Sequence, residues 1–197
     1  ALDPSDGRNP LCYGYLLATL GHLSEARAAL EQGTLADPLL APLWYWLGRV
    51  AAAQGDYDAA REALGRVRVI DPDFMPAATY LGVIAQLQGD SAAARDIFRA
   101  SPRGFGRQIA EYRLAPSAAA GAALRAQLVA DAPKDPYGAA IAYTALGDID
   151  TAFGLLDGVV DRHDGVALML PYDPQLKALR TDPRFGALLR RMGLPAG

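Results

Sequence analysis

Few side chains of this sequence have the types and the spacing that catalysis or metal binding requires. The chain contains two histidines, His22 and His163, and one cysteine, Cys12. Neither histidine has a second histidine or a thiolate at the spacing of a metal site, so we interpret both as solvated turn residues. Cys12 has no neighbouring base and is interpreted as a small buried thiol rather than a nucleophile. We therefore predict no enzyme activity and no catalytic, cofactor-binding or metal-binding residues.

Four aspartates lie close enough together in the sequence to suggest a calcium loop: Asp148, Asp150, Asp161 and Asp164. Their stretches, GDID and DRHDG, lack the alternating oxygen ligands and the terminal glutamate of an EF-hand. The pattern therefore favours helix capping and solvation for these four carboxylates.

Two basic stretches could bind an anion or a nucleic acid. The stretch RGFGRQ, residues 103–108, follows no predicted strand and lacks a third glycine, so we interpret it as a turn between repeats with Arg103 and Arg107 exposed. The arginines near the C-terminus lack interleaved aromatic residues, and the formal net charge of the chain is -3. We therefore expect no nucleic-acid partner, and the absence of an apolar run of about 18 residues predicts no membrane insertion within this stretch.

The strongest pattern in the sequence is a repeat of 34 residues. When the chain is aligned with itself at an offset of 34 residues, equivalent positions form columns. Two columns contain only glycine, one at Gly14, Gly48 and Gly82 and the other at Gly21, Gly55 and Gly89. Further columns hold alanine at Ala26, Ala60 and Ala94, a large apolar residue at Leu30, Leu64 and Phe98, and Asp-Pro at residues 3–4, 37–38 and 71–72. This period is typical of helix-turn-helix repeats, so the sequence predicts consecutive helix pairs.

Each column has a mechanical reason. A glycine inside the first helix costs about 1 kcal/mol relative to alanine, which indicates that another helix approaches closely there. The second glycine falls where the first helix ends, in the left-handed conformation that glycine adopts without strain. We expect the large apolar column to fill the space between neighbouring helix pairs. The Asp-Pro pair follows the second helix, because proline disfavours helix in the residue before it.

The segment 44–72 resembles a tetratricopeptide repeat (TPR) unit, on the strength of Trp44, Leu47, Gly48, Ala60, Leu64 and Pro72. The resemblance implies an all-α fold, a right-handed TPR superhelix (α-solenoid) of stacked antiparallel helix pairs with a helical C-terminal cap. The expected segments are the end of a truncated upstream repeat at 1–6, TPR units at 7–40, 41–74 and 75–108, a degenerate helical pair at 109–132, a divergent TPR unit at 133–165, and C-terminal capping helices at 166–197. In the divergent unit the columns are occupied by Ala140, Tyr143, Gly147, Ala152 and Leu156.

The C-terminal segment contains two Asp-Pro helix starts, at residues 173–174 and 182–183. Its apolar side is predicted at Leu176, Leu179, Phe185, Leu188 and Leu189, with Arg180, Arg184, Arg190 and Arg191 in solvent. The stretch DPRFGALLRRMGLP resembles the finish of TPR arrays in bacterial winged-helix transcriptional regulators, adenylate cyclases and protein kinases. The resemblance implies the C-terminal region of a larger regulatory protein. It favours a cytoplasmic location, with a periplasmic one if a membrane segment lies upstream.

The TPR resemblance also implies a concave face, lined by the first helix of each pair, that holds a protein or peptide segment. The predicted partner-binding groove consists of Leu11, Tyr15, Tyr45, Arg49, Thr79, Val83, Gln86, Tyr137 and Ile141. The lysine and asparagine set that clamps a chaperone's C-terminal carboxylate in some TPR domains is absent from these positions.

Several alternatives to this groove stay open. The tyrosines could serve only to pack repeats together. The chain could instead be a small-ligand-sensing or accessory domain of a signalling enzyme, with a pocket formed by residues 103–135. A third alternative is homo-oligomerisation through the exposed first repeat. A further column of arginines, at Arg27, Arg61 and Arg95, is interpreted as an exposed face that repeats with the unit rather than as a binding stripe.

Overall fold

The computed structural model describes residues 8–100 and 105–195, and every regular element within these ranges is helical. The helices pack in consecutive pairs, which confirms the predicted all-α fold and is consistent with a TPR helical solenoid. The predicted end of an upstream repeat at 1–6 and the predicted exposure of Arg103 lie outside the described residues. The chain divides into two compact units, Ala1–Ile84 and Ala85–Gly197, with the boundary inside one helix.

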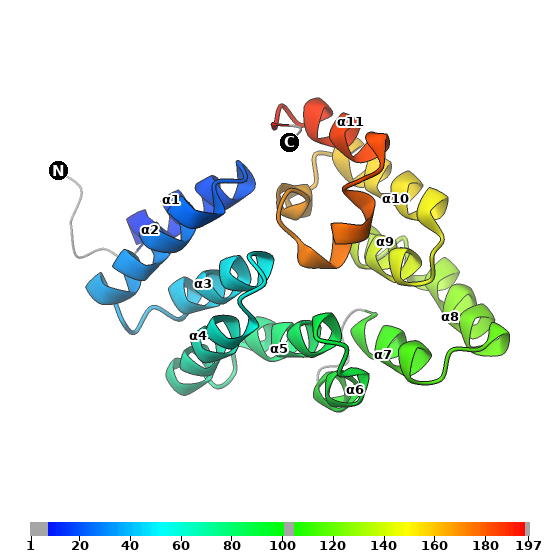
Figure 1. The fold of residues 1–197 in the computed structure, drawn as a ribbon, viewed down its shortest axis with the longest axis horizontal. Helices are drawn as coiled ribbons and strands as arrows, with labels where there is room; N and C mark the ends of the chain where they lie inside the picture. The colour runs from blue at the N-terminus through cyan, green and yellow to red at the C-terminus, as the bar shows by residue number, and fades with distance from the viewer. Residues whose placement is uncertain (1–7, 101–104, 196–197) are drawn as a thin grey trace. The chain divides into compact units, whose positions relative to one another are not determined.

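The first unit is built from two complete helix pairs and the beginning of a third. Its helices are α1 (Arg8–Thr19), α2 (Leu23–Ala36), α3 (Ala41–Ala53), α4 (Tyr57–Ile70) and most of α5 (Met75–Leu87). Helix α1 packs against α2, α3 packs against α4, and the two pairs meet through the contacts of α3 with α1 and α2 (Figure 1).

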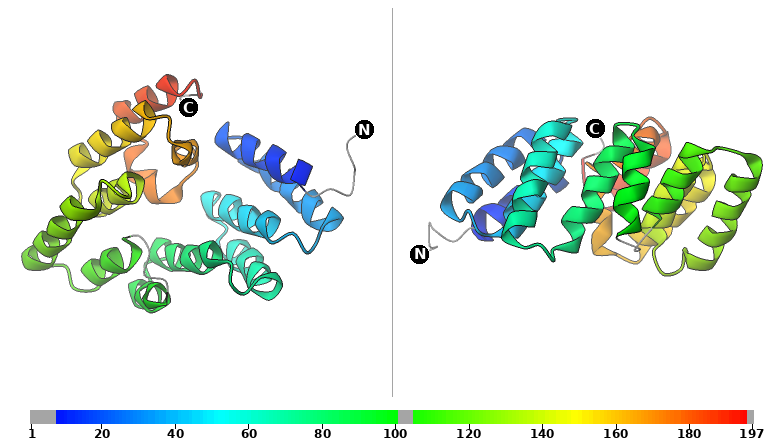
Figure 2. Two further views of the ribbon diagram at one scale, coloured as in Figure 1. Left: turned by 180° about the vertical axis from the view of Figure 1, so that it is seen from behind. Right: turned by 90° about the horizontal axis from the view of Figure 1, so that it is seen from below.

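The second unit continues from the end of α5. Its elements are α6 (Ser91–Arg99), α7 (Gly106–Leu114), α8 (Ala118–Asp131), α9 (Pro136–Ala145), α10 (Ile149–Asp161), the short 3₁₀ helices η1 (Gly165–Met169) and η2 (Pro174–Leu179), and α11 (Pro183–Arg191). Each α-helix from α6 to α11 packs against the next, and the segment that carries η2 lies against α9 (Figure 2). Helix α7 begins at Gly106, slightly before the predicted boundary at 109, so Arg107 lies in its first turn instead of an inter-repeat turn.

The second glycine column closes the first helix of each pair, as predicted. Gly55 has φ +85, and the amide of Asp56 donates to the carbonyl of Ala51 at 2.9 Å. Gly21, Gly89 and Gly147 have φ values of +86, +82 and +76 and repeat the same hydrogen-bond pattern. This pattern is the Schellman motif, which satisfies carbonyl groups left free at the end of a helix.

The first glycine column allows two helices to touch, but within a pair rather than between pairs. A Cβ atom added at Gly14 would lie 2.6 Å from Cγ of Leu30, and one at Gly48 would lie 3.0 Å from Cγ of Leu64. Leu30 and Leu64 are fully buried. Leu30 and Leu64 therefore pack onto the glycine of their own pair. By contrast, a Cβ atom added at Gly106 in α7 would lie 2.5 Å from Cζ of Phe98, so the third member of this column packs against the helix that follows its own pair, as expected.

The C-terminal segment buries its predicted apolar side. The buried residues there include Leu176, Leu179, Phe185, Leu188 and Leu189, and Arg180, Arg184, Arg190 and Arg191 are exposed. The carboxylates of the two Asp-Pro pairs accept backbone N–H groups at the helix starts, from Gln175 at 3.0 Å and from Arg184 at 2.9 Å.

The four clustered aspartates serve as caps and ion-pair partners. Asp148 accepts from the amide of Thr151 at the start of α10, and Asp164 accepts from the amide of Val166 at the start of η1. Asp150 and Asp161 take part in ion pairs that join α10 to α11, with Arg184 and Arg191 respectively. The interpretation of these residues as capping and solvated groups is confirmed for the two caps.

Candidate partner-binding site

Aromatic side chains gather on the first helices of the first unit. The ring of Tyr15 in α1 lies 4.7 Å from that of Trp46 in α3, and Tyr45 lies 5.8 Å from Trp46. Tyr45 also contacts Phe74 at 5.4 Å and Tyr80 in α5 at 6.3 Å, as distances between ring centroids. Tilted and edge-to-face arrangements at these distances are favourable for aromatic pairs. The rings therefore form one connected set across three first helices.

Arg49 lies inside this set. Only 5% of its surface is exposed, and its guanidinium carbon lies 5.0 Å from the ring centroid of Tyr80 and 5.1 Å from that of Trp46. Aromatic faces attract a cation at such distances, and a planar guanidinium stacks on them readily. Burial raises the pKa of Tyr15 above its ordinary value, while the nearby charge of Arg49 acts in the opposite direction. The residues Tyr15, Tyr45, Trp46, Arg49, Phe74 and Tyr80 are called the aromatic–arginine cluster below.

The predicted groove residues differ in accessibility. Arg49, Val83, Gln86 and Tyr137 are buried, whereas Leu11, Tyr15, Tyr45, Thr79 and Ile141 are half-buried. Tyr15, Tyr45 and Arg49 meet in the aromatic–arginine cluster. Gln86, Tyr137 and Ile141 belong to the second unit. The assignment of these residues to one partner-binding groove stays a prediction.

Two of the predicted residues have internal roles in the second unit. The hydroxyl of Tyr137 donates to the carboxylate of Asp173 at 3.0 Å, and Nε2 of Gln86 donates to the carbonyl of Gly106 at 2.7 Å. Such bonds satisfy polar groups in a buried setting, which makes these two side chains part of the framework.

Three members of the cluster were not among the predicted residues: Trp46, Phe74 and Tyr80. The sequence carried a signal for two of them, because Trp46 and Tyr80 occupy one column of the 34-residue repeat, together with Cys12. The signal is that this column places a large aromatic residue, Trp46 and then Tyr80, on two consecutive first helices.

Cys12 is exposed, so the prediction of a buried thiol at this position is wrong. The later positions of its column are covered to different degrees, Trp46 being half-buried and Tyr80 buried. Helix α1 is the first helix among the described residues, so no described helix precedes it to cover the side of α1 that carries Cys12. His22 and His163 both lie exposed in turns, as predicted, and His163 has φ 53.

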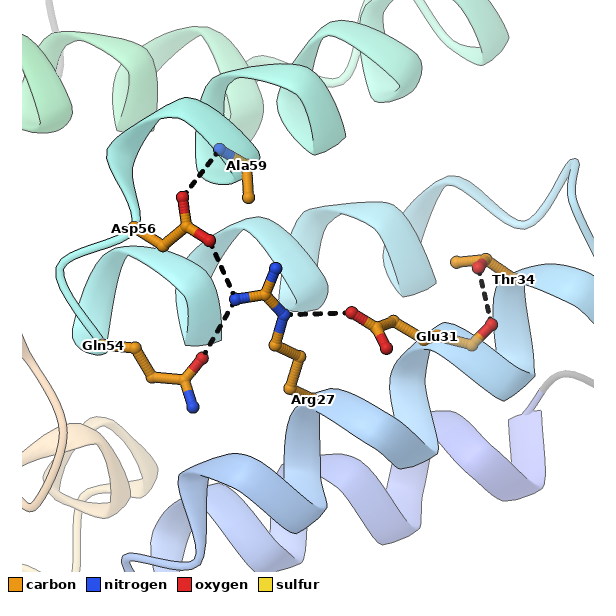
Figure 3. A network of polar contacts seen from close by, with 6 residues as sticks. All are labelled: Arg27, Glu31, Thr34, Gln54, Asp56 and Ala59. Atoms are coloured by element: carbon orange, nitrogen blue, oxygen red, sulfur yellow. Dashed lines mark hydrogen bonds and ion pairs between the residues drawn. The ribbon is translucent and has the colours of Figure 1, made fainter.

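Arg27 has a role beyond that of an exposed repeated face. It reaches from α2 to the turn between α3 and α4, where it donates to Asp56 at 3.0 Å and to Gln54 at 3.4 Å (Figure 3). It also bonds Glu31 of its own helix at 3.0 Å. Hydrogen bonds to Glu31 and Asp56 raise the pKa of Arg27. The bond to Asp56 connects two consecutive helix pairs. The sequence missed this role because the partner lies 29 residues away.

The region suggested for a small-ligand pocket contains a shallow cavity between α7 and α8. Its volume is about 250 Å³, and its lining includes Gln108, Tyr112 and Leu124. Known small-molecule sites run from about 300 to 1,000 Å³, so this cavity is small for a ligand.

The described residues contain no group of three or more histidine, cysteine, aspartate or glutamate side chains that could hold a metal ion. In the same part of the chain, none of the helices combines the length and the apolar character needed to span a bilayer.

Comparison with known protein families identifies a match to a repeat family. The tetratricopeptide repeat family model matches residues 14–73 and 54–109, which together cover α2 to α6 and the second half of α1. No curated protein matches the chain. Proteins of this repeat family typically act as non-catalytic scaffolds, and their repeats generally mediate protein–protein interaction. Residues 14–109 of the chain are therefore similar to tetratricopeptide repeats.

Proposed function

We propose that this chain is a non-catalytic scaffold that binds a segment of a partner protein on the first helices of its repeats. The aromatic–arginine cluster is the observation that carries the proposal. Tyrosine, tryptophan and arginine are the residues most enriched at the energetic centres of protein interfaces. They offer a large contact area and a polar group at modest entropic cost. Tyr15, Tyr45, Trp46 and Phe74 keep part of their surface accessible.

Tyr45 is the member best suited to a direct contact. Its ring touches three other rings of the cluster, so its position is fixed before any partner arrives. A side chain held in place loses little freedom on binding, which favours affinity. Arg49 is more deeply buried and supports the rings instead of reaching outward.

A peptide selection tests this proposal. Random peptides are displayed and selected on the whole chain, and the affinity of the enriched peptides is measured by fluorescence anisotropy. Tyr45→Ala is expected to weaken binding about tenfold or more, the effect of removing a central interface residue. Tyr57→Ala is the matched control, because Tyr57 is also a half-buried tyrosine but begins the second helix α4.

Both variants are compared with the wild type by circular dichroism at the assay temperature. Tyr45→Phe retains the ring and should keep most of the affinity. Equal binding by the wild type and a folded Tyr45→Ala variant would contradict the proposed site.

The wider setting proposed for this scaffold is the C-terminal interaction or sensory region of a larger bacterial regulatory protein. The C-terminal stretch DPRFGALLRRMGLP supports this setting by its resemblance to the finish of such arrays. A winged-helix, cyclase or kinase domain encoded upstream would agree with it, and an unrelated upstream domain would contradict it.

Homo-oligomerisation through α1 is a second candidate, favoured by exposed apolar residues. Tyr13 and Leu16 are 55% and 53% exposed, whereas Val50 and Ile84, which follow Leu16 in its column, are buried. Leu16→Glu should lower the mass measured by sedimentation equilibrium if α1 pairs with a second copy. Leu35→Glu on α2 is the control, since Leu35 is 85% exposed. A monomeric wild type at all concentrations would exclude this candidate.

A further inference from the structure

The second unit contains a larger cavity whose charged lining residues are both cationic. Its volume is about 490 Å³, and it is bordered by the end of α5, α7, α9 and the η2 segment. This volume lies within the range of small-molecule binding sites. Five lining residues enter the argument: Ile109, Arg113, Ile141, Gln175 and Lys177.

Two positive charges and no acidic side chain line this cavity. Arg113 comes from α7 and Lys177 from η2. Among the residues that the structure describes, neither side chain forms a hydrogen bond or an ion pair. By contrast, Arg107 on the same helix α7 lies 3.8 Å from Glu111, and Lys134 lies 2.8 Å from Asp131. The two cations at the cavity therefore lack the carboxylate neighbour that these residues have.

A buried carboxylate beside η2 is already engaged. Asp173 directly precedes η2, is 2% exposed and does not line the cavity. Its two oxygens accept from the hydroxyl of Tyr137 at 3.0 Å and from the amide of Gln175 at 3.0 Å. Because both oxygens have donors, Asp173 is not a free partner for the cations of the cavity.

Arg113 has lost part of its hydration without gaining a counterion. Protein atoms packed around it lower the pKa of Arg113 through desolvation, although part of the side chain still reaches solvent. The desolvation of a charge is costly unless an opposite charge or hydrogen bonds compensate for it. An anion beside Arg113 would supply that compensation.

We propose that this cavity binds a small organic dianion with two carboxylates joined by a short apolar chain. Arg113 and Lys177 bind the carboxylates, for which a guanidinium and an ammonium are the natural partners. Ile109 and Ile141 line the apolar part of the cavity and cover the chain of the ligand. The site is formed by residues of the second unit, whereas the aromatic–arginine cluster belongs to the first, and the site does not depend on the proposed peptide binding.

Isothermal titration calorimetry with glutarate, on the whole chain at low ionic strength, tests this site. Glutarate should bind with a Kd below about 1 mM, and its uncharged dimethyl ester should not bind. Arg113→Gln and Lys177→Gln should each raise the Kd about tenfold or more, because a hydrogen bond to a charged group is lost. Lys177→Arg keeps the charge and should retain binding within about threefold.

Two control variants carry the same charge change elsewhere in the second unit, Arg107→Gln and Lys134→Gln. Both should bind glutarate within about twofold of the wild type, and circular dichroism should show the same helix content for all variants. Four results would each overturn the proposal: no binding of glutarate up to 10 mM, equal losses in the control variants, equal competition by inorganic sulfate, or tighter binding of a glutamate hexapeptide than of glutarate. None of these results bears on the peptide selection, which reports on Tyr45 in the first unit.

Discussion

The clearest prediction concerns two glycines of the first unit that differ only in their surroundings. Gly14 lies inside α1 against Leu30, and Gly65 lies inside α4 with nothing within 4 Å of an added Cβ atom. The same change to alanine should therefore shift the free energy of unfolding in opposite directions. Gly65→Ala should stabilise the chain, and Gly14→Ala should destabilise it.

The magnitudes follow from the local geometry. Alanine in a helix interior is favoured over glycine by about 0.5–1 kcal/mol, which is the full effect expected at Gly65. At Gly14 the added carbon would lie 2.6 Å from Cγ of Leu30, the branch point of a fully buried side chain. Overpacking of this kind costs about 1–3 kcal/mol. Because the same propensity gain applies in both helices, the two variants should differ by the overpacking cost alone, roughly 1–3 kcal/mol.

Urea unfolding followed by circular dichroism at 25 °C measures both variants against the wild type. Because both glycines belong to the first unit, the comparison concerns the same part of the chain. If Gly14→Ala were as stabilising as Gly65→Ala, the reason given for the first glycine column would be refuted.

Three further predictions concern caps and charges. His22 precedes α2 at the N-cap position but forms no side-chain cap. Asp56 and Asp90 occupy the equivalent positions of later repeats, and their carboxylates accept backbone N–H groups at 3.1 and 2.9 Å. His22→Asp should therefore raise the free energy of unfolding by about 1 kcal/mol. His163 lies in the turn after α10 and has φ 53, a conformation that glycine adopts without strain. His163→Gly should therefore raise the free energy of unfolding by about 0.5–1 kcal/mol. An unchanged melting curve would contradict this strain. The pKa of Asp56 is lowered, mainly by the hydrogen bond from the amide of Ala59 and then by Arg27. The ionised Asp56 therefore stabilises the fold above the pKa of the unfolded state, about 3.9. This stabilisation is lost as the pH falls through the lower pKa of the folded state. Urea titrations of wild type and Asp56→Asn should accordingly converge between about pH 5 and pH 2, and a constant difference would argue against this linkage.

The sequence predicted the helix pairs and their turns well because those features depend on local chemistry. A left-handed turn needs glycine at one position, so Gly147 could be assigned even where the repeat changes phase. Asp-Pro pairs likewise locate helix starts through the fixed backbone of proline.

Features that depend on contacts between repeats were harder to predict. The columns treat all repeats as equivalent, so Cys12 was expected to be buried although α1 is the first described helix. Arg27 looked like a solvated charge because its partner Asp56 belongs to the next pair. The cationic cavity combines Arg113 and Lys177 from segments far apart in the chain, and no local pattern marks such a meeting.

Photo-crosslinking of a selected peptide tests the central claim, that partners bind on the first helices of the repeats, most directly. Benzoylphenylalanine is placed at position 45 in α3 or at position 57 in α4 of the otherwise unchanged chain, and crosslinked peptide is quantified by mass spectrometry. The account predicts efficient crosslinking from position 45 and little from position 57. Crosslinking from position 57 alone, or equally from both positions, would contradict it.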